Sequence, residues 1–297
     1  MKNGHAIIAA LFCVLTSCAK AKPSEPAAPA RAPELQAYDD AADRMLGMAD
    51  GGWIVSRGSG GEVQHEGDSL LWTGMALGTL DCARAAPVEK GLLAMIDSEA
   101  GGLYRHPNLR GQDVSMDGAL GFYWGVVHHV VRCPDSLEAW RTAMASHQAH
   151  GFKMPTKGFE HVQKDVFHFF GLLADGGTNH DLAEEGAAWA AAVNARHAAA
   201  YRIHLVLLAY QTVEATGDHL LGSQRDRFCS ATRGTGMPTT DFYCGRDDLT
   251  NWLAAYVPNA WEFRHQRGQW ESPDGGGLET PGLDYLVALR SKYNFQE

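Results

Sequence analysis

Two stretches decide the fold class: residues 69–82, SLLWTGMALGTLDC, and residues 116–133, MDGALGFYWGVVHHVVRC. Both are apolar on almost every side of a helix, which is typical of helices buried inside a domain. Each also carries two glycines one helical turn apart, where a neighbouring helix can approach closely. These glycines are Gly74, Gly78, Gly121 and Gly125.

The surrounding sequence is also helical in pattern, with buried helices alternating with amphipathic ones. Pro87 suits the first turn of a helix, and Pro134-Asp135-Ser136 suits the start of a more polar one. The pattern predicts further helices over residues 34–48, 87–97, 134–149, 165–174, 182–196, 198–215, 247–256 and 282–293.

Several predicted buried helices begin beside an aspartate, which suggests a repeat. The first two intervals run from 68 to 117 and from 117 to 165, which is 49 and 48 residues. We therefore expect an all-α fold, an α/α toroid of about six helix pairs, complete or incomplete. Its inner helices would run parallel, and the glycine-rich loops 58–67, 101–115 and 258–281 would gather at one mouth. An irregular helical bundle is the alternative. The aspartates are Asp68, Asp117, Asp165, Asp248 and Asp284.

The first residues have the pattern of an export signal. Lys2 precedes an apolar run over residues 6–15, which is too short to span a bilayer. The run ends in Leu15-Thr16-Ser17-Cys18, which resembles the lipobox of bacterial lipoproteins. The resemblance implies that residues 1–17 are a signal peptide and that Cys18 is lipidated. An ordinary cleaved signal peptide is the alternative.

That resemblance also implies a location in the bacterial cell envelope, with the membrane as a partner through the lipid on Cys18. Ala19 follows the cysteine, which favours the outer membrane over the inner one. Residues 18–33 form an Ala/Pro-rich tether, and residues 34–297 form a single domain in the periplasm or on the cell surface. The rest of the chain contains no second apolar stretch long enough to span a bilayer.

The composition limits the kinds of partner that the chain can be expected to bind. The net charge is −10, which argues against a nucleic-acid surface, and the hydrophobic content of 45% supports a sizeable core. Four cysteines follow the tether, and an oxidising compartment favours disulfides. We expect Cys229–Cys244, which closes a short loop, and Cys82–Cys133, which would join successive inner helices. Free thiols or a metal site are the weaker alternative, because the chain has no C-x-x-C pair.

Asp68 and Asp117 stand in related contexts at the starts of the two buried helices. If the repeat holds, they face one groove, where two carboxylates can divide the acid and base work of sugar cleavage. We therefore take both as catalytic candidates. The alternative is that each carboxylate only caps its helix, since aspartate is a preferred N-cap residue.

The stretch 259–274, NAWEFRHQRGQWESPD, is the densest in chemistry. Tryptophan offers a flat face to a sugar ring, and arginine can hold a carboxylate through two hydrogen bonds. Glu271 is the third catalytic candidate. The alternative is a loop whose tryptophans fill the toroid and whose charges pair with each other. The substrate-binding candidates here are Glu262, Arg264, His265, Arg267 and Trp270.

His106 lies in the loop before the second buried helix and is a further candidate for binding a substrate. His128-His129 sits within an apolar helix, where packing and hydrogen bonding explain it better than catalysis. Histidine pairs elsewhere lack a full set of metal ligands, so no metal is predicted. No phosphate-binding loop, dinucleotide fingerprint or serine-nucleophile motif is present, so no cofactor is predicted.

Aspartates at inner-helix starts and aromatic loops at the mouth are similar to the layout of α/α-toroid carbohydrate-active enzymes, such as unsaturated glucuronyl hydrolases and polysaccharide lyases. The resemblance implies a glycoside hydrolase that cleaves an oligo- or polysaccharide by carboxylate acid/base catalysis. The same resemblance also fits a polysaccharide lyase, in which His106 and Arg264 would have a larger part in catalysis. A non-catalytic glycan-binding or structural lipoprotein of the envelope is the third reading, because fold alone does not fix function.

Overall fold

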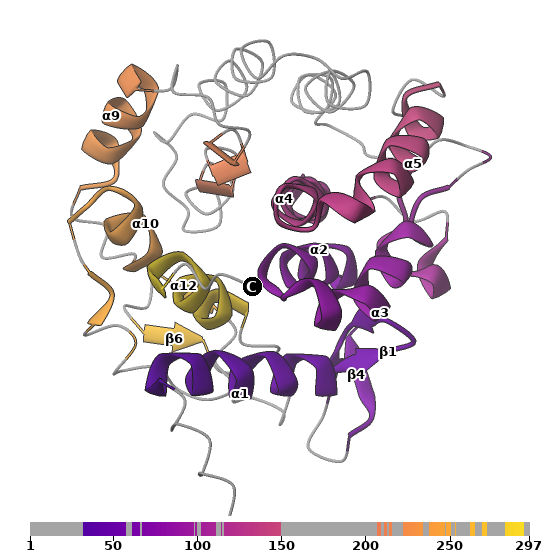
Figure 1. Cartoon of the computed structure of the whole chain (residues 1–297), viewed down its shortest axis with the longest axis horizontal. Helices are drawn as coiled ribbons and strands as arrows, with labels where there is room; N and C mark the ends of the chain where they lie inside the picture. The colour runs from indigo at the N-terminus through magenta and orange to yellow at the C-terminus, as the bar shows by residue number, and fades with distance from the viewer. Residues whose placement is uncertain are drawn as a thin grey trace, which may run out of the picture. The chain divides into compact units, whose positions relative to one another are not determined.

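A computed structural model describes the chain over residues 32–57, 61–65, 67–97, 99, 102–110, 114, 116–149, 207–208, 211–212, 214–215, 222–233, 238–246, 248–250, 253, 262–264, 269–271 and 283–293. These residues are mostly helical, as the sequence predicts, with a few short strands. Figure 1 labels the elements. The helices are α1 (Pro33–Gly47), α2 (Ser69–Thr79), α3 (Cys82–Leu93), α4 (Met116–Arg132), α5 (Leu137–Ala149), α9 (Gly222–Ala231), α10 (Pro238–Tyr243) and α12 (Leu283–Tyr293), with the short 3-10 helices η1 (Pro107–Leu109) and η2 (Pro134–Ser136).

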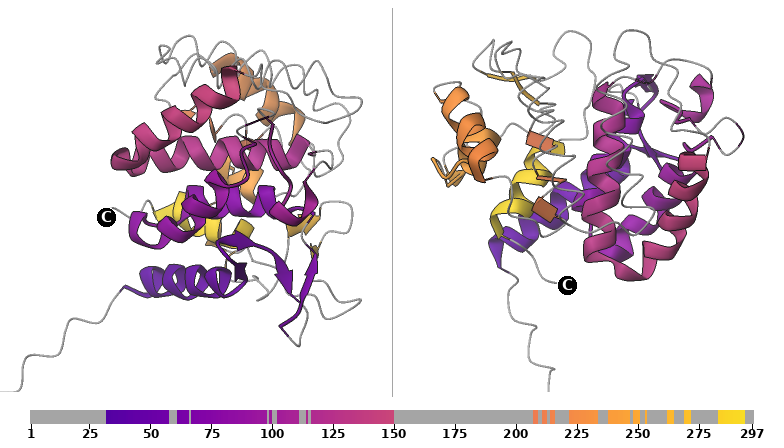
Figure 2. Two further views of the ribbon diagram at one scale, coloured as in Figure 1. Left: turned by 90° about the vertical axis from the view of Figure 1, so that its right-hand side faces the viewer. Right: turned by 90° about the horizontal axis from the view of Figure 1, so that it is seen from above.

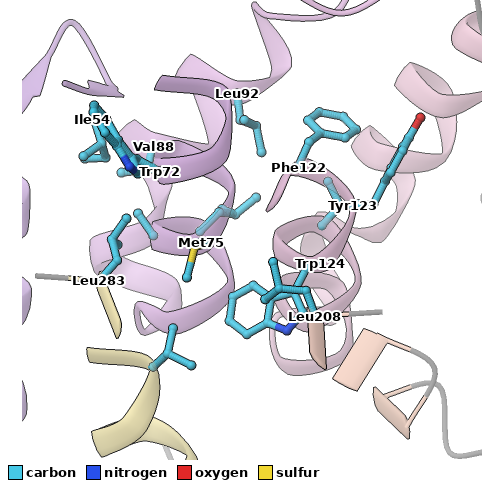
Figure 3. Packing of buried hydrophobic residues seen from close by; sticks show 14 of the residues in the cluster. Ile54, Trp72, Met75, Val88, Leu92, Phe122, Tyr123, Trp124, Leu208 and Leu283 are labelled. Carbon is cyan, nitrogen blue, oxygen red and sulfur yellow. The ribbon is translucent and has the colours of Figure 1, made fainter. Parts of the chain in front are cut away.

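Helices α2 and α4 pack against each other more extensively than any other two described elements. The prediction that both are buried is confirmed: Leu77 in α2 and Phe122 in α4 are fully buried. Figure 3 shows their side chains in the core, with Met75 lying between the two helices. A Cβ atom at Gly74 or Gly125 would overlap the backbone of the opposite helix, so only glycine permits this close approach.

The two helices run parallel. Leu71 contacts Gly121, Gly74 contacts Gly125, and Gly78 contacts Gly125, so positions rise together along both helices. Figures 1 and 2 show α2 and α4 side by side. Because they are parallel and in register, their starts lie at one end of the pair and their last turns at the other.

Other helices surround this pair. Helix α12 packs on α2 and on α1, α3 packs on both α2 and α4, and α5 packs on α4. The Tyr38 hydroxyl of α1 donates to the Thr79 carbonyl at the end of α2, at 2.7 Å. The Arg84 guanidinium of α3 donates to the buried Asp39 carboxylate of α1, at 2.6 Å. These contacts fix α1 and α3 to the last turn of α2.

The strands form three short hairpins that the sequence pattern did not predict. The first, β1 (Ala49–Asp50) and β2 (Trp53–Ile54), turns at Gly51 and Gly52, whose φ angles are positive. The second joins β3 (Ser56–Arg57) and β4 (Val63–His65), and the third joins β5 (Glu262–Arg264) and β6 (Gln269–Glu271). Strand β4 and the whole third hairpin lie within stretches that we expected to be loops throughout.

The boundary between the first buried helix and its successor also differs from the prediction. Helix α2 ends at Thr79, and Cys82 begins α3. The Asp81 carboxylate accepts a hydrogen bond from the Arg84 N–H, so α3 is capped and begins before Pro87, which falls inside it. The second predicted boundary is confirmed, because η2 starts at Pro134 and α5 follows it.

Both predicted disulfides are present, Cys82–Cys133 and Cys229–Cys244, with Cα–Cα distances of 5.7 and 5.5 Å. The first bridges the residues that follow the last turns of α2 and α4, as the parallel arrangement requires. The predicted helices over residues 165–174 and 182–196, and Cys18, for which lipidation is predicted, lie outside the described residues. Among the residues that are described, no helix has the length and apolar character needed to cross a membrane.

Candidate functional sites at the two ends of the α2–α4 pair

Asp68 precedes α2, but its carboxylate does not cap the helix. Instead its Oδ1 atom lies 3.3 Å from the Arg105 guanidinium, and the Arg105 carbonyl accepts a hydrogen bond from the Leu70 N–H. Both side chains of the ion pair remain about a quarter exposed, at 23% and 27%. The alternative that this carboxylate only caps α2 is therefore wrong for Asp68. It is held in place by a guanidinium and remains accessible.

Asp117 lies in the first turn of α4. Since Gly74 packs between Gly121 and Gly125 and the two helices run parallel, position 117 lies about level with position 68. Packed helices have axes about 8 to 10 Å apart, and glycines at the contact favour the short end of that range. The two aspartates therefore start neighbouring helices at the same end of the pair. The structure describes the backbone of Asp117 and not its side chain.

His106 is buried, with 1% of its surface exposed. Its Nδ1 atom accepts a hydrogen bond from the Asn108 N–H at the start of η1, and its ring meets the Trp53 ring edge to face, with the centroids 5.4 Å apart. In this conformation His106 orders the loop before α4 and does not face solvent.

The β5–β6 hairpin brings together part of the chemically dense stretch. Glu262 pairs with Glu271 across the two strands, Phe263 with Trp270, and Arg264 with Gln269. Strand β5 contacts α12. This register places positions 262 and 271 directly opposite each other in the hairpin. His265 and Arg267 lie outside the described residues.

A pocket of about 690 Å³ lies at the other end of the α2–α4 pair, beside the last turns of both helices. Helix α12, the segment around Gln211 and helix α10 complete its walls. Asp68 is not part of it, since ten residues of α2, or about 15 Å, separate Asp68 from Gly78. The described residues that line the pocket are Gly78, Thr79, Trp124, His128, Val131, Arg132, Gln211, Glu214, Ala215, Phe242, Tyr243, Val287, Arg290 and Ser291.

Trp124, His128 and Arg132 form a stripe along α4, each one turn after the last. The Trp124 and His128 rings are stacked at a tilt, with the centroids 4.3 Å apart, and the Trp124 indole N–H donates to the Gln211 side-chain oxygen at 3.1 Å. The Arg132 guanidinium donates to the carbonyls of Leu77 and Gly78 at 3.0 and 2.9 Å. Arg132 thereby satisfies carbonyls that the end of α2 leaves without helical partners.

The opposite wall carries an acid. The Glu214 carboxylate accepts a hydrogen bond from the Tyr243 hydroxyl at 2.9 Å and lies 3.5 Å from the Arg225 guanidinium. Arg225 also stacks over the Tyr243 ring, at 4.6 Å from its centroid. The charge of Glu214 is therefore balanced by an arginine outside the pocket lining.

His128 adds no charge to the pocket. Burial, reinforced by the positive charge of Arg132, lowers the pKa of His128 from 6.5 to about 3, and hydrogen bonding to the Gln211 backbone opposes this only in part. The imidazole is therefore neutral at every pH at which the protein is expected to work.

This pKa predicts an acid-sensitive fold. In the unfolded chain His128 gains a proton below about pH 6.5, whereas in the folded chain it does so only near pH 3. The free energy of unfolding should therefore fall as the pH drops from 6.5 towards 3, by at most about 1.4 kcal/mol per pH unit from this group. Urea unfolding at pH 7, 5 and 4 should show a shallower fall for His128→Gln than for the natural chain. Equal slopes would contradict the assignment.

A second histidine forms a polar cluster that is structural. His129 is buried, and its Nε2 atom lies 3.1 Å from the Ser136 hydroxyl and 3.3 Å from the Glu89 carboxylate, which also accepts from the Trp140 indole. The Ser136 hydroxyl and the Glu89 carboxylate both lie beside Nε2 of His129. In a catalytic triad, the serine and the carboxylate bind opposite nitrogens of the histidine ring. The prediction that His129 is packed and hydrogen-bonded is confirmed.

Of the residues that line the pocket, the sequence pointed only to Gly78, as a helix-contact glycine, and to His128, as a packed side chain. The signal was present in the spacing of Trp124, His128 and Arg132, which places them on one face of an otherwise apolar helix. Within the described residues no cluster of three or more histidines, cysteines and carboxylates could hold a metal ion. Comparison with protein-family models, curated proteins and solved structures finds no match to this chain.

Proposed function

We propose that this chain is an exported lipoprotein whose helical domain cleaves glycosidic bonds at the N-terminal end of the α2–α4 pair. The observation that supports this most is the level alignment of Asp68 and Asp117 on two parallel, closely packed helices. Glycosidases need two carboxyl groups about 5 to 10 Å apart, which is comparable to the distance between the axes of closely packed helices.

The roles follow from position. Asp117 and Asp68 act as the acid and base pair, with Arg105 holding Asp68 in place. Glu271 completes the site from the hairpin on α12. The same hairpin and the chain that joins its strands bind the substrate. The binding residues are Glu262, Arg264, His265, Arg267 and Trp270.

The α/α toroid is the arrangement that we propose for the whole domain. It is supported by the order of the described contacts, in which α12, α2 and α4 lie in one row and α1, α3 and α5 flank them. The repeat of aspartate-led helices predicts that the row continues through residues 165–215.

A panel of polysaccharides tests the activity. The full chain, solubilised in detergent, should release new reducing ends from at least one neutral or acidic polysaccharide without ultraviolet absorbance from an unsaturated uronate. Absorbance at the new ends would instead identify a lyase, in which Arg264 neutralises the uronate carboxylate. Binding without either product would contradict catalysis and identify a glycan-binding lipoprotein.

Lipidation of Cys18 has a separate test. Cys18→Ser should move the protein from the membrane fraction to the soluble fraction of a bacterial host, because several acyl chains are needed for stable anchoring. Mass spectrometry of the natural mature protein should find its N-terminus at Cys18, carrying lipid. An unmodified N-terminus elsewhere would point to an ordinary cleaved signal peptide.

A further inference from the structure

We infer that the pocket beside the last turns of α2 and α4 binds a neutral sugar. It is separate from the proposed catalytic site, since Asp68 and Asp117 lie where the same two helices begin. The inference does not rest on the proposed hydrolase activity, because it uses a different set of residues at the opposite end of the helix pair.

Part of the pocket lining is apolar. Val131 of α4, Phe242 of α10 and Val287 of α12 contribute to it, together with Ala215. A sugar ring carries C–H groups that pack on such a surface and hydroxyls that need polar partners. The volume of about 690 Å³ lies within the range of pockets that enclose small ligands, and an apolar lining with a few polar groups is their usual composition.

The polar part of the lining keeps capacity for hydrogen bonds. Nε2 of His128 has no hydrogen-bond partner among the described residues, and a neutral imidazole offers one donor and one acceptor. The Gln211 side chain accepts from Trp124 through its oxygen, which leaves the N–H donors of its amide group. Glu214 accepts from Tyr243 through Oε1, so its second oxygen remains an acceptor.

Hydroxyl groups match this mixture of donors and acceptors. A hydroxyl both donates and accepts, so it can pair with a neutral imidazole, an amide N–H or a carboxylate. Ser291 of α12 adds a hydroxyl of its own to the lining. A hydrocarbon of the same size would take water away from His128 and Gln211 without replacing its hydrogen bonds, which costs free energy. The lining therefore favours a ligand with several hydroxyls.

The charged groups of the lining already interact with other parts of the protein. Arg132 donates to two carbonyls of α2, and Arg290 lies over the Tyr38 ring, at 5.8 Å from its centroid. Glu214 lies 3.5 Å from the Arg225 guanidinium. An acid that enters the pocket would meet the carboxylate, and an amine would meet the two guanidinium groups. A ligand without charge avoids both repulsions.

Probes that share a six-membered ring test the inference. The full chain, in a detergent that carries no sugar, is titrated by calorimetry with the methyl glycosides of glucose, galactose and mannose. We expect at least one to bind with a dissociation constant of about 1 mM or below. The uronate and the 2-amino analogue of that sugar, and cyclohexylmethanol, should each bind about tenfold more weakly or worse. Equal or tighter binding of any of these three, or no binding of a neutral sugar, would overturn the inference.

A bulky substitution locates the binding site. Ala215→Trp should abolish binding of the sugar, because the indole would fill the pocket. Ala139→Trp makes the same change on the exposed surface of α5, so it is the matched control and should leave binding unaltered. Sugar binding that survives Ala215→Trp would place the ligand elsewhere in the chain and overturn the assignment.

His128→Phe tests recognition by hydrogen bonds. The variant keeps a flat ring against Trp124 but removes both nitrogens, so it should weaken sugar binding about tenfold and leave cyclohexylmethanol binding unchanged. Unchanged sugar binding, or an equal loss for both probes, would show that the imidazole only packs and would overturn its role in recognition. If Ala215→Trp does not fold, the probe series and His128→Phe still decide between the outcomes.

Discussion

A single added methyl group at Gly125 is expected to lower the free energy of unfolding by about 3 kcal/mol. A Cβ atom there would overlap the Gly74 backbone carbonyl of α2, and backbone cannot move aside as a flexible side chain can. The helices would have to separate, which would strain the Cys82–Cys133 disulfide at their ends and open the core that both helices fill. Chemical unfolding of Gly125→Ala should give a midpoint well below that of the natural chain, and the melting temperature should fall by on the order of 10 °C.

Gly47→Ala is the matched control. Gly47 ends α1, and a Cβ atom built there meets nothing within 4 Å. The same chemical change should therefore alter the free energy of unfolding by less than about 0.5 kcal/mol. If Gly125→Ala proves as harmless as Gly47→Ala, α2 and α4 do not touch through their glycines. The level alignment of Asp68 and Asp117 would then lose its support.

The buried helices were predictable because apolar character on every side is a local property of the sequence. The glycine pairs at 74 and 78 and at 121 and 125 also marked the close contact correctly. The expected repeat predicted that the two buried helices run parallel. Parallel helices end on the same side, and this supported Cys133 as the disulfide partner of Cys82. The spacing of nearby residues in the sequence specifies which helix faces are buried. The cysteines then indicate which helix ends lie together.

The errors have local causes as well. Pro87 favoured a later helix start, but the Asp81 cap begins α3 five residues before that proline. Strands of two or three residues, such as β1 and β2, are too short to show a period in the sequence. The Asp68 carboxylate had an equally plausible partner in the backbone, and only the fold brings Arg105 to it from 37 residues away.

The whole pocket beside the last turns of α2 and α4 could not be predicted from the sequence, although Trp124, His128 and Arg132 share one face of α4. Its lining comes from α2, α4, the segment around Gln211, α10 and α12, which are up to about two hundred residues apart in the chain. No local spacing links Trp124 with Tyr243 or Arg290. Nothing in a pattern of residues shows that Arg132 caps a neighbouring helix while its charge reaches His128.

Asp117→Asn is expected to lower turnover of the responsive polysaccharide by about a thousandfold, with the fold intact. Asparagine has the shape of aspartate but cannot carry the transferred proton. Asp68→Asn should lower turnover by a similar factor, because it removes the other carboxylate of the pair. Its cost in stability should stay below about 1 kcal/mol, because the ion pair with Arg105 is partly exposed. Turnover is measured as reducing ends released per enzyme, and folding as the unfolding midpoint of each variant.

Asp248→Asn is the control that separates catalysis from a general effect of removing a charge near a helix start. Asp248 is exposed, and its carboxylate accepts a hydrogen bond from the Thr250 N–H at 2.9 Å, in a local turn. Its replacement should leave turnover unchanged. If Asp117→Asn and Asp68→Asn both keep full turnover, the aligned carboxylates are not the catalytic pair, and Glu262 and Glu271 on the β5–β6 hairpin become the next residues to replace. Loss in both variants, with Asp248→Asn active, would tie the chemistry to the end of the α2–α4 pair where the two helices begin.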